Sequence, residues 1–122
     1  MNTLEKKNYY NSLLTIYSSQ LTQVEKEDML DYYNNDLSLS EIAINRNVSR
    51  NAVYLSIKQG EKKLDELETR LSLLSKLNKI IHELEIANKE EDISKLKENI
   101  SKIIEELKNG IWITLRKITR HI

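Results

Sequence analysis

The sequence contains no cysteine and no proline, and only two glycines, Gly60 and Gly110. Without cysteine it has no disulfide framework, no zinc–thiolate site and no thiol nucleophile. β-Sandwiches and α/β domains normally place several prolines and glycines at their turns, whereas long helices need neither. We therefore predict an all-α fold for this chain of 122 residues, which is long enough for one domain with an extension.

An excess of one charge and long apolar runs are also missing. The 19 lysines and arginines balance the 19 aspartates and glutamates, so a nucleic-acid site would have to be a local basic patch. No apolar run reaches the roughly 18 residues of a membrane span, and residues 1–10 lack the apolar core of a signal peptide. We expect a cytoplasmic protein without stable membrane insertion.

No group of side chains predicts catalysis. His82 and Glu85 have a metal-ligating spacing, but one such pair cannot supply the ligands of a di-metal bundle, so a solvated helix face is the better interpretation. The isolated glycines exclude a Gly-rich phosphate loop, and neither His82 nor His121 belongs to a Ser-His-Asp set. We predict a protein that is not an enzyme and has no cofactor and no metal.

Two capping boxes divide the first part of the chain into helices. Thr22 precedes Glu25, and Ser38 precedes Glu41, by the three residues that mark a helix start. Helices are expected at about 4–19, from 22 to a stop at 34–36, and at about 39–44. Five of the six tyrosines lie on the first two of these helices, where we expect the rings to pack with their hydroxyls at the surface.

A tight turn at 45–49 joins the short third helix to a helix that begins at Arg50, which is the shape of a helix-turn-helix. Ala43 is the small residue at the expected crossing. The residues expected to pack the second helix on the first are Val48, Ala52, Val53 and Ile57. The candidates for nucleic-acid contact on the outer side are Arg46, Ser49, Arg50, Asn51, Tyr54 and Lys58. An ordinary helical hairpin with a solvated outer face is the alternative.

From residue 50 to about 87 nothing but Gly60 weakens the helical pattern, which predicts one helix of about 55 Å. Such a helix must project, and its apolar stripe needs a partner. The candidate oligomerisation residues are Leu64, Leu67, Leu71, Leu74, Leu77, Ile81 and Leu84. A returning helix at about 92–108, with a heptad pattern and a stop at Asn109-Gly110, completes the expected arm. We expect a homodimer.

Residues 111–122 carry four basic or histidine side chains and no acid: Arg116, Lys117, Arg120 and His121. Apolar residues at 111, 115, 118 and 122 suit one face of a helix, although 111–115 also looks like a strand. Docking on the core or on a sister chain is the first interpretation, and a membrane or nucleic-acid role stays open. The expected domains are a helix-turn-helix at 1–60, an oligomerisation arm at 61–110 and a basic tail at 111–122.

The helix-turn-helix segment resembles the YlxM-type helix-turn-helix proteins. The resemblance rests on residues 36–43, 48–54 and 57–58, with Leu21-Thr22 and Asp31-Tyr32-Tyr33, and it covers about residues 4–85. These proteins are similar to region 4 of sigma factors in their DNA-binding half, and their genes commonly neighbour that of the signal recognition particle GTPase. The resemblance implies a non-catalytic DNA-binding regulator, or an accessory factor of that pathway.

Three positions depart from the family pattern. The family usually has glutamine at the position of Asn51, an acid at the position of Leu55 and a basic residue near the position of Gln59. The recognition helix is therefore less polar than usual, and Leu55 suits a protein contact. The alternative function is a protein-binding adaptor in which the helix-turn-helix is a scaffold. Duplex DNA, RNA and components of the signal recognition particle all stay candidate partners.

Overall fold

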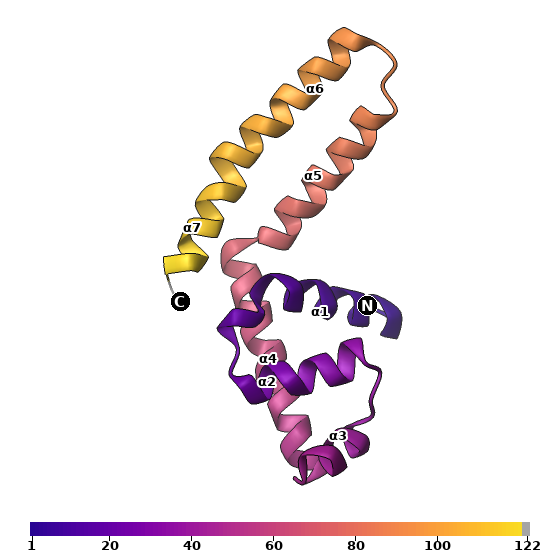
Figure 1. Cartoon of the computed structure of the whole chain (residues 1–122), viewed down its shortest axis with the longest axis vertical. Coiled ribbons are helices and arrows are strands. Elements are labelled where there is room, and N and C mark those ends of the chain that lie inside the picture. The colour runs from indigo at the N-terminus through magenta and orange to yellow at the C-terminus, as the bar shows by residue number, and fades with distance from the viewer. Residues whose placement is uncertain (121–122) are drawn as a thin grey trace. The chain divides into compact units, whose positions relative to one another are not determined.

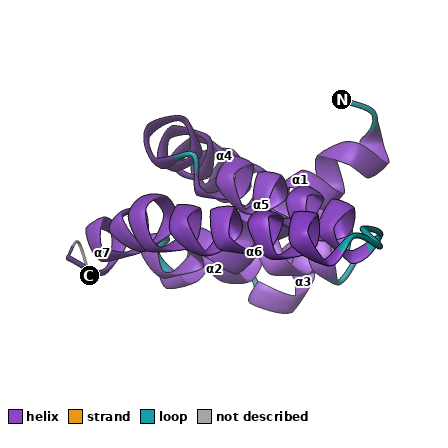
Figure 2. Ribbon diagram, turned by 90° about the horizontal axis from the view of Figure 1, so that it is seen from above, coloured by secondary structure: helices purple, strands orange, loops and turns teal. Residues whose placement is uncertain are grey.

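The structure, a computed structural model, describes residues 1–120, and of residues 118–120 it describes the backbone alone. Every regular element in this part of the chain is helical, which confirms the all-α prediction (Figure 2). The chain divides into two compact units, an amino-terminal unit (Met1–Arg70) and a carboxy-terminal unit (Leu71–Ile122).

The amino-terminal unit is a cluster of short helices around one longer helix (Figure 1). Its elements are α1 (Thr3–Tyr17), η1 (Ser18–Gln20), α2 (Gln23–Met29), η2 (Leu30–Asn34), α3 (Leu39–Arg46) and α4 (Arg50–Leu71). Both predicted capping boxes are confirmed, because the side chain and backbone of each pair exchange hydrogen bonds at the starts of α2 and α3. Asp36, in the predicted stop, has the left-handed conformation with φ 57°.

The core of this unit leaves no room for a side chain at Gly60. A Cβ atom there would lie 2.3 Å from the sulfur of Met29, and Met29 is fully buried. Gly60 therefore lets α4 approach the end of α2 closely, and it is not a weak point in the helix. Leu13, Tyr17 and Leu64 are fully buried in the same unit.

Three tyrosine hydroxyls donate to three carboxylates along one side of α4. Tyr33 donates to Glu61 at 2.6 Å, Tyr10 to Asp65 at 2.9 and 3.1 Å, and Tyr17 to Glu68 at 2.8 Å. The acids stand four and three residues apart, a spacing that puts them on the same helix face. Of the five tyrosines predicted to pack, Tyr10, Tyr17 and Tyr33 are buried, with their hydroxyls directed at α4 and not at the surface. Tyr9 is half-buried and Tyr32 is exposed, which corrects the prediction for Tyr32.

Burial sets the protonation of these pairs. Burial and the hydrogen bond to Glu61 raise the pKa of Tyr33 far above its ordinary value, and burial and Asp65 do the same for the pKa of Tyr10. Burial also raises the pKa of Asp65, although the hydrogen bond from Tyr10 lowers it. Tyr33 and Tyr10 are therefore protonated hydrogen-bond donors at neutral pH.

The prediction of one continuous helix from residue 50 to 87 is wrong. Helix α4 ends at Leu71, Ser72 has a left-handed conformation with φ 53°, and α5 (Leu73–Asn88) begins after it. Neither proline nor glycine stands at this break. The break lies next to the boundary between the two units, which falls between Arg70 and Leu71.

The carboxy-terminal unit is a helical hairpin. Its elements are α5, α6 (Ile93–Glu106), η3 (Leu107–Ile111) and α7 (Trp112–Arg120). Asp92 caps α6 by accepting from the N–H groups of Ser94 and Lys95. Helices α5 and α6 lie side by side and antiparallel, and Lys79 and Glu106 join them at 3.2 Å (Figure 1).

The helix stop predicted at Asn109-Gly110 is also wrong. The chain passes through η3 into α7 without leaving the helix, and Gly110 does not take the positive φ that a glycine stop requires. The segment after it is therefore a helix and not a strand. His121 and Ile122 lie outside the described residues, as do the side chains of residues 118–120.

The two glycines provide a matched test of the α4 contact. Gly60→Ala should lower the free energy of unfolding by about 1–3 kcal/mol, because Met29 must move within a closed core. Gly110→Ala should leave the free energy of unfolding unchanged or raise it by up to about 1 kcal/mol, since nothing lies within 4 Å of its Cβ position. Urea denaturation followed by circular dichroism measures both; equal effects would contradict the close approach at Gly60.

Two neighbouring tyrosines test the buried hydrogen bonds. Tyr33→Phe should lower the free energy of unfolding by about 1–3 kcal/mol, because it removes the donor to a carboxylate that is only 8% exposed. Tyr32→Phe should have almost no effect, since Tyr32 is 37% exposed. Thermal and urea unfolding should separate the two variants; a Tyr33→Phe protein as stable as the wild type would show that Glu61 does not need the hydroxyl.

Candidate nucleic-acid interface

Helices α3 and α4 form the predicted helix-turn-helix. Asn47 ends α3 in a left-handed conformation with φ 55°, and the N–H of Val48 donates to the carbonyl of Ala43 at 3.0 Å. Helix α4 then begins at Arg50, so three residues make the turn. Ala43 is buried, as expected for the small residue at the crossing.

Only part of the predicted contact between the two helices is found. Val53 and Ile57 are buried on the inner side of α4, as predicted. Val48 and Ala52 are exposed, which corrects their assignment to the core. Two inward residues one turn apart are enough to fix which side of α4 faces out, because the rest follows from about 100° of rotation per residue.

The outer side of α4 carries a mixed polar and apolar surface. Asn51, Tyr54, Leu55 and Lys58 are exposed there. Arg50 is exposed as well, at the amino-terminal end of α4, but its position in the helix lies on the same side as Val53 and Ile57. The exposed fraction of Leu55 is 57% and that of Tyr54 is 42%, so this surface also offers an apolar contact. We call the residues 49–51, 54, 55 and 58 the α4 surface.

Ser49 is the amino-terminal cap of α4. Its hydroxyl oxygen accepts from the N–H of Ala52 at 3.0 Å, and its carbonyl accepts from Val53 at 3.3 Å. The N–H groups of Arg50 and Asn51 have no carbonyl acceptor within the helix, because no helical residue lies four positions before them. They are therefore directed outward, at the positive end of the helix dipole, where an anion is favoured.

Arg46 differs from the other predicted contact residues. Its Nη2 donates to Asp28 Oδ2 at 2.7 Å, while its Nε lies 2.6 Å from Oδ1 as an ion-pair contact without hydrogen-bond alignment. Asp28 is completely buried on α2. Arg46 therefore neutralises a buried carboxylate and ties α3 to α2, and we correct its assignment as a nucleic-acid contact.

Lys58 is held in place by two neighbours. Its Nζ lies 3.3 Å from Glu61 and 5.6 Å from the centre of the Tyr54 ring. The ammonium group is thus partly neutralised, although its side chain stays 45% exposed. Within the part of the chain that the structure describes, Arg50 has no ion-pair partner and is the strongest free positive charge of the α4 surface.

The buried acids that organise this region were not predicted from the sequence. Glu25, Asp28 and Glu61 are all buried, and each has a basic partner. Burial alone would raise the pKa of Glu25, but hydrogen bonds from Lys63 and Thr22 hold it below its ordinary value. The only signal in the sequence was the spacing of Glu25 and Asp28 relative to Met29, which places all three on one face of α2.

The predicted oligomerisation stripe is divided between the two units. Leu64 is fully buried in the amino-terminal unit and is not available to a partner chain, which corrects its assignment. Leu67 and Leu71 are half-buried farther along α4. Leu74 and Leu77 of α5 are half-buried as well, whereas Ile81 and Leu84 are about half exposed.

Other kinds of site find little support among the described residues. No cluster of three or more acidic or histidine side chains there has the arrangement of a metal site. None of the helices described is long and apolar enough to cross a membrane.

The chain is similar to a known protein family over most of its length. A model of the UPF0122 family, described as "Putative helix-turn-helix protein, YlxM / p13 like", matches residues 4–109. The match therefore extends beyond the helix-turn-helix and includes α5 and α6. Recognition of the family from the sequence is confirmed, and its extent was underestimated.

Several bacterial UPF0122 proteins are similar to the chain. One from Bacillus thuringiensis (strain Al Hakam) is 43% identical over 97 residues, covering 71% of this chain and 88% of that protein. One from Fusobacterium nucleatum is 48% identical over 73 residues, covering 60% and 71%. One from Malacoplasma penetrans is 44% identical over 66 residues, covering 54% of this chain and 62% of that protein.

Two arginines separate folding from surface roles. Arg46→Gln should lower the free energy of unfolding by about 2–3 kcal/mol, because it leaves Asp28 buried without its cation. Arg50→Gln should change the free energy of unfolding by less than about 0.5 kcal/mol, since its side chain is exposed. Chemical denaturation measures both; a destabilised Arg50→Gln protein would remove Arg50 from the α4 surface.

Proposed function

We propose, from the premise that the chain belongs to the UPF0122 family of YlxM / p13-like helix-turn-helix proteins, that the α4 surface binds a nucleic acid. The observation that supports this most is the first turn of α4, where Arg50 and Asn51 are both exposed, Asn51 on the outer side of the helix and Arg50 at its amino-terminal end. The outward N–H groups of the same two residues can donate to a phosphate oxygen. The guanidinium and amide side chains suit contacts to phosphates or base edges.

The charges of the α4 surface imply weak binding that depends only modestly on salt. Arg46 is held by Asp28 and Lys58 lies against Glu61, so Arg50 is the main source of positive charge. One or two phosphate contacts give a slope of log affinity against log salt of only about −1 to −2. We expect a dissociation constant for mixed duplex DNA in the range of about 10–100 μM at low salt.

The proposed role is that of a non-catalytic regulator or accessory factor in the cytoplasm. The resemblance to YlxM-type proteins suggests the signal recognition particle pathway as its setting. The RNA of that particle is therefore a partner to test beside duplex DNA. An RNA partner would be recognised through its phosphates and unpaired bases, for which Tyr54 offers a ring to stack on.

A protein-binding adaptor is the second candidate. Leu55 is more than half exposed beside Tyr54, and an apolar and aromatic pair of this kind suits a protein contact. The internal ion pair of Arg46 favours the same alternative, since it takes one positive charge away from the surface. In this case the helix-turn-helix is a scaffold, and components of the signal recognition particle are the proteins to test.

Fluorescence anisotropy with a mixed duplex and with structured RNA tests the first proposal. Arg50→Gln should weaken binding and reduce the salt slope by about one, because one phosphate contact is lost. Lys89→Gln is the matched control, since Lys89 is an exposed base in the connection between α5 and α6. Binding by this control should equal that of the wild type.

Two results would remove the nucleic-acid proposal. One is the absence of binding by the wild type at low salt to both DNA and RNA. The other is an equal loss of affinity in Arg50→Gln and Lys89→Gln, which would indicate a diffuse charge effect. Capture of partners with and without nuclease, compared between the wild type and Leu55→Glu, then tests the adaptor.

A further inference from the structure

The hairpin of the carboxy-terminal unit has one apolar face. With about 100° of rotation per residue, Ile81 and Leu84 lie to one side of Ile80, a buried residue of α5. Ile103 is the corresponding buried residue of α6, and the other apolar residues of α6 lie to one side of it. Because α5 and α6 are antiparallel neighbours, these residues and those of α5 lie on the same face of the hairpin (Figure 1). The exposed fractions of the apolar residues on this face are 40% to 68%; they are Ile81, Leu84, Ile93, Ile100, Ile104 and Leu107.

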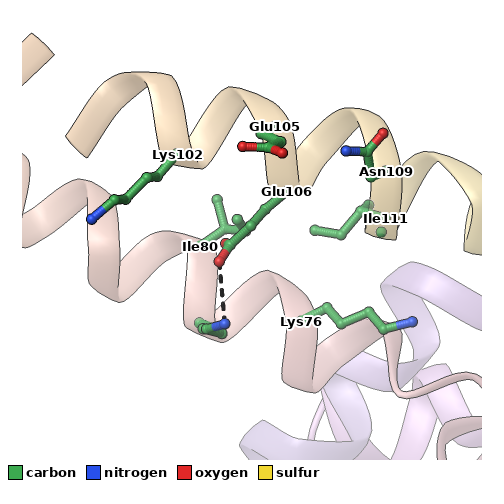
Figure 3. A pocket seen from close by; sticks show the side chains of 9 residues that line it. Lys76, Ile80, Lys102, Glu105, Glu106, Asn109 and Ile111 are labelled. Carbon is green, nitrogen blue, oxygen red and sulfur yellow. Dashed lines mark hydrogen bonds and ion pairs between the residues drawn. The ribbon is translucent and has the colours of Figure 1, made fainter. Parts of the chain in front are cut away.

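The opposite face of the hairpin is polar and pairs its own charges. Lys79 lies 3.2 Å from Glu106 and 3.8 Å from Glu83, and Lys102 lies 3.6 Å from Glu98. A groove of about 540 Å³ opens there between α5 and α6, with Glu106 reaching across it from α6 (Figure 3). Charged groups thus cover this side of the hairpin, while the apolar face lacks such a cover.

We propose that the apolar face is covered by the same face of a second copy of this chain, giving a four-helix bundle with a two-fold axis along the helices. A two-helix hairpin cannot bury a stripe that runs along both of its helices, and an apolar area of this extent marks a contact surface. A two-fold dimer satisfies it without any other component, because each copy offers the surface that the other one needs.

The charges at the edges of the apolar face set the direction of the axis. Glu85 borders it on α5, and Lys97 and Lys108 border it on α6, all three exposed. The Lys79–Glu106 contact fixes the register of the hairpin, so residue 85 is level with about residue 100, and Lys97 lies three residues, or about 4.5 Å, from that level, within reach of two long side chains. With the axis along the helices, α5 faces the partner's α6, and Glu85 meets the partner's Lys97. With the axis perpendicular to the helices, α6 would face the partner's α6, and the lysines at their edges would repel each other.

Two isoleucines on opposite faces of α5 form a matched pair for the test. Ile81 is 52% exposed on the apolar face, and Ile86 is 51% exposed on the other. In sedimentation and light scattering of the full chain, the wild type should have about twice the 14.4 kDa of one chain. Ile81→Glu should raise the dimer dissociation constant about a hundredfold or more, and Ile86→Glu should leave it unchanged.

A wild-type monomer at about 100 μM, or equal behaviour of Ile81→Glu and Ile86→Glu, overturns the proposal. A charge exchange tests the axis without touching the apolar residues. Glu85→Lys and Lys97→Glu should each raise the dissociation constant about tenfold, and the double variant should restore it to within about threefold of the wild type. A double variant that is no better than either single variant overturns the proposed axis. The inference does not rest on nucleic-acid binding, since mass and affinity for nucleic acid are measured separately.

Discussion

The position of α4 depends on carboxylates that lie against the short helices around it, with Glu61 buried and Asp65 and Glu68 half-buried. Glu61, Asp65 and Glu68 receive tyrosine hydroxyls, and Gly60 allows the close approach to Met29 next to them. Burying a carboxylate without a donor costs several kcal/mol, so α4 has few alternative registers once these pairs form. This packing also sets the orientation of the α4 surface, because the residues of α4 that do not pack against the short helices are the ones exposed to solvent.

A second set of buried charges attaches the helix-turn-helix to the rest of the amino-terminal unit. The Asp28–Arg46 pair joins α2 to α3, and the Glu25–Lys63 pair joins α2 to α4. Both acids lie on α2, which therefore serves as the common support of the two helices of the motif. This arrangement keeps α3 and α4 in place but takes Arg46 away from the surface. One of the few basic side chains of the helix-turn-helix is thus used for folding, and the proposed interface is left with Arg50 and a partly neutralised Lys58.

Local signals in the sequence were sufficient for much of the fold. Capping boxes and turn residues predicted the starts of α2 and α3 and the turn before α4, because such contacts involve residues three or four apart. The break at Ser72, the continuous helix through Gly110 and the burial of Asp28 could not be predicted in this way. Each depends on which distant residue lies opposite, and a single acidic side chain looks the same in a sequence whether it meets water or an arginine. The exposure of Arg50, Asn51 and Tyr54 on the α4 surface was predicted from the sequence. The assignment of Arg46 was wrong, because its buried partner Asp28 could not be recognised from the sequence.

The most direct test of the nucleic-acid proposal is a titration of ¹⁵N-labelled full chain with a short duplex and with structured RNA, followed by amide chemical shifts. We expect the largest chemical-shift changes at Arg50, Asn51 and Tyr54, since their N–H groups lie at or beside the proposed phosphate contact. The amides of α5 and α6 should be unchanged, because the exposed apolar residues of these helices have no role in this binding. Saturating nucleic acid that leaves the first turn of α4 unshifted, or that shifts the hairpin instead, would contradict the account.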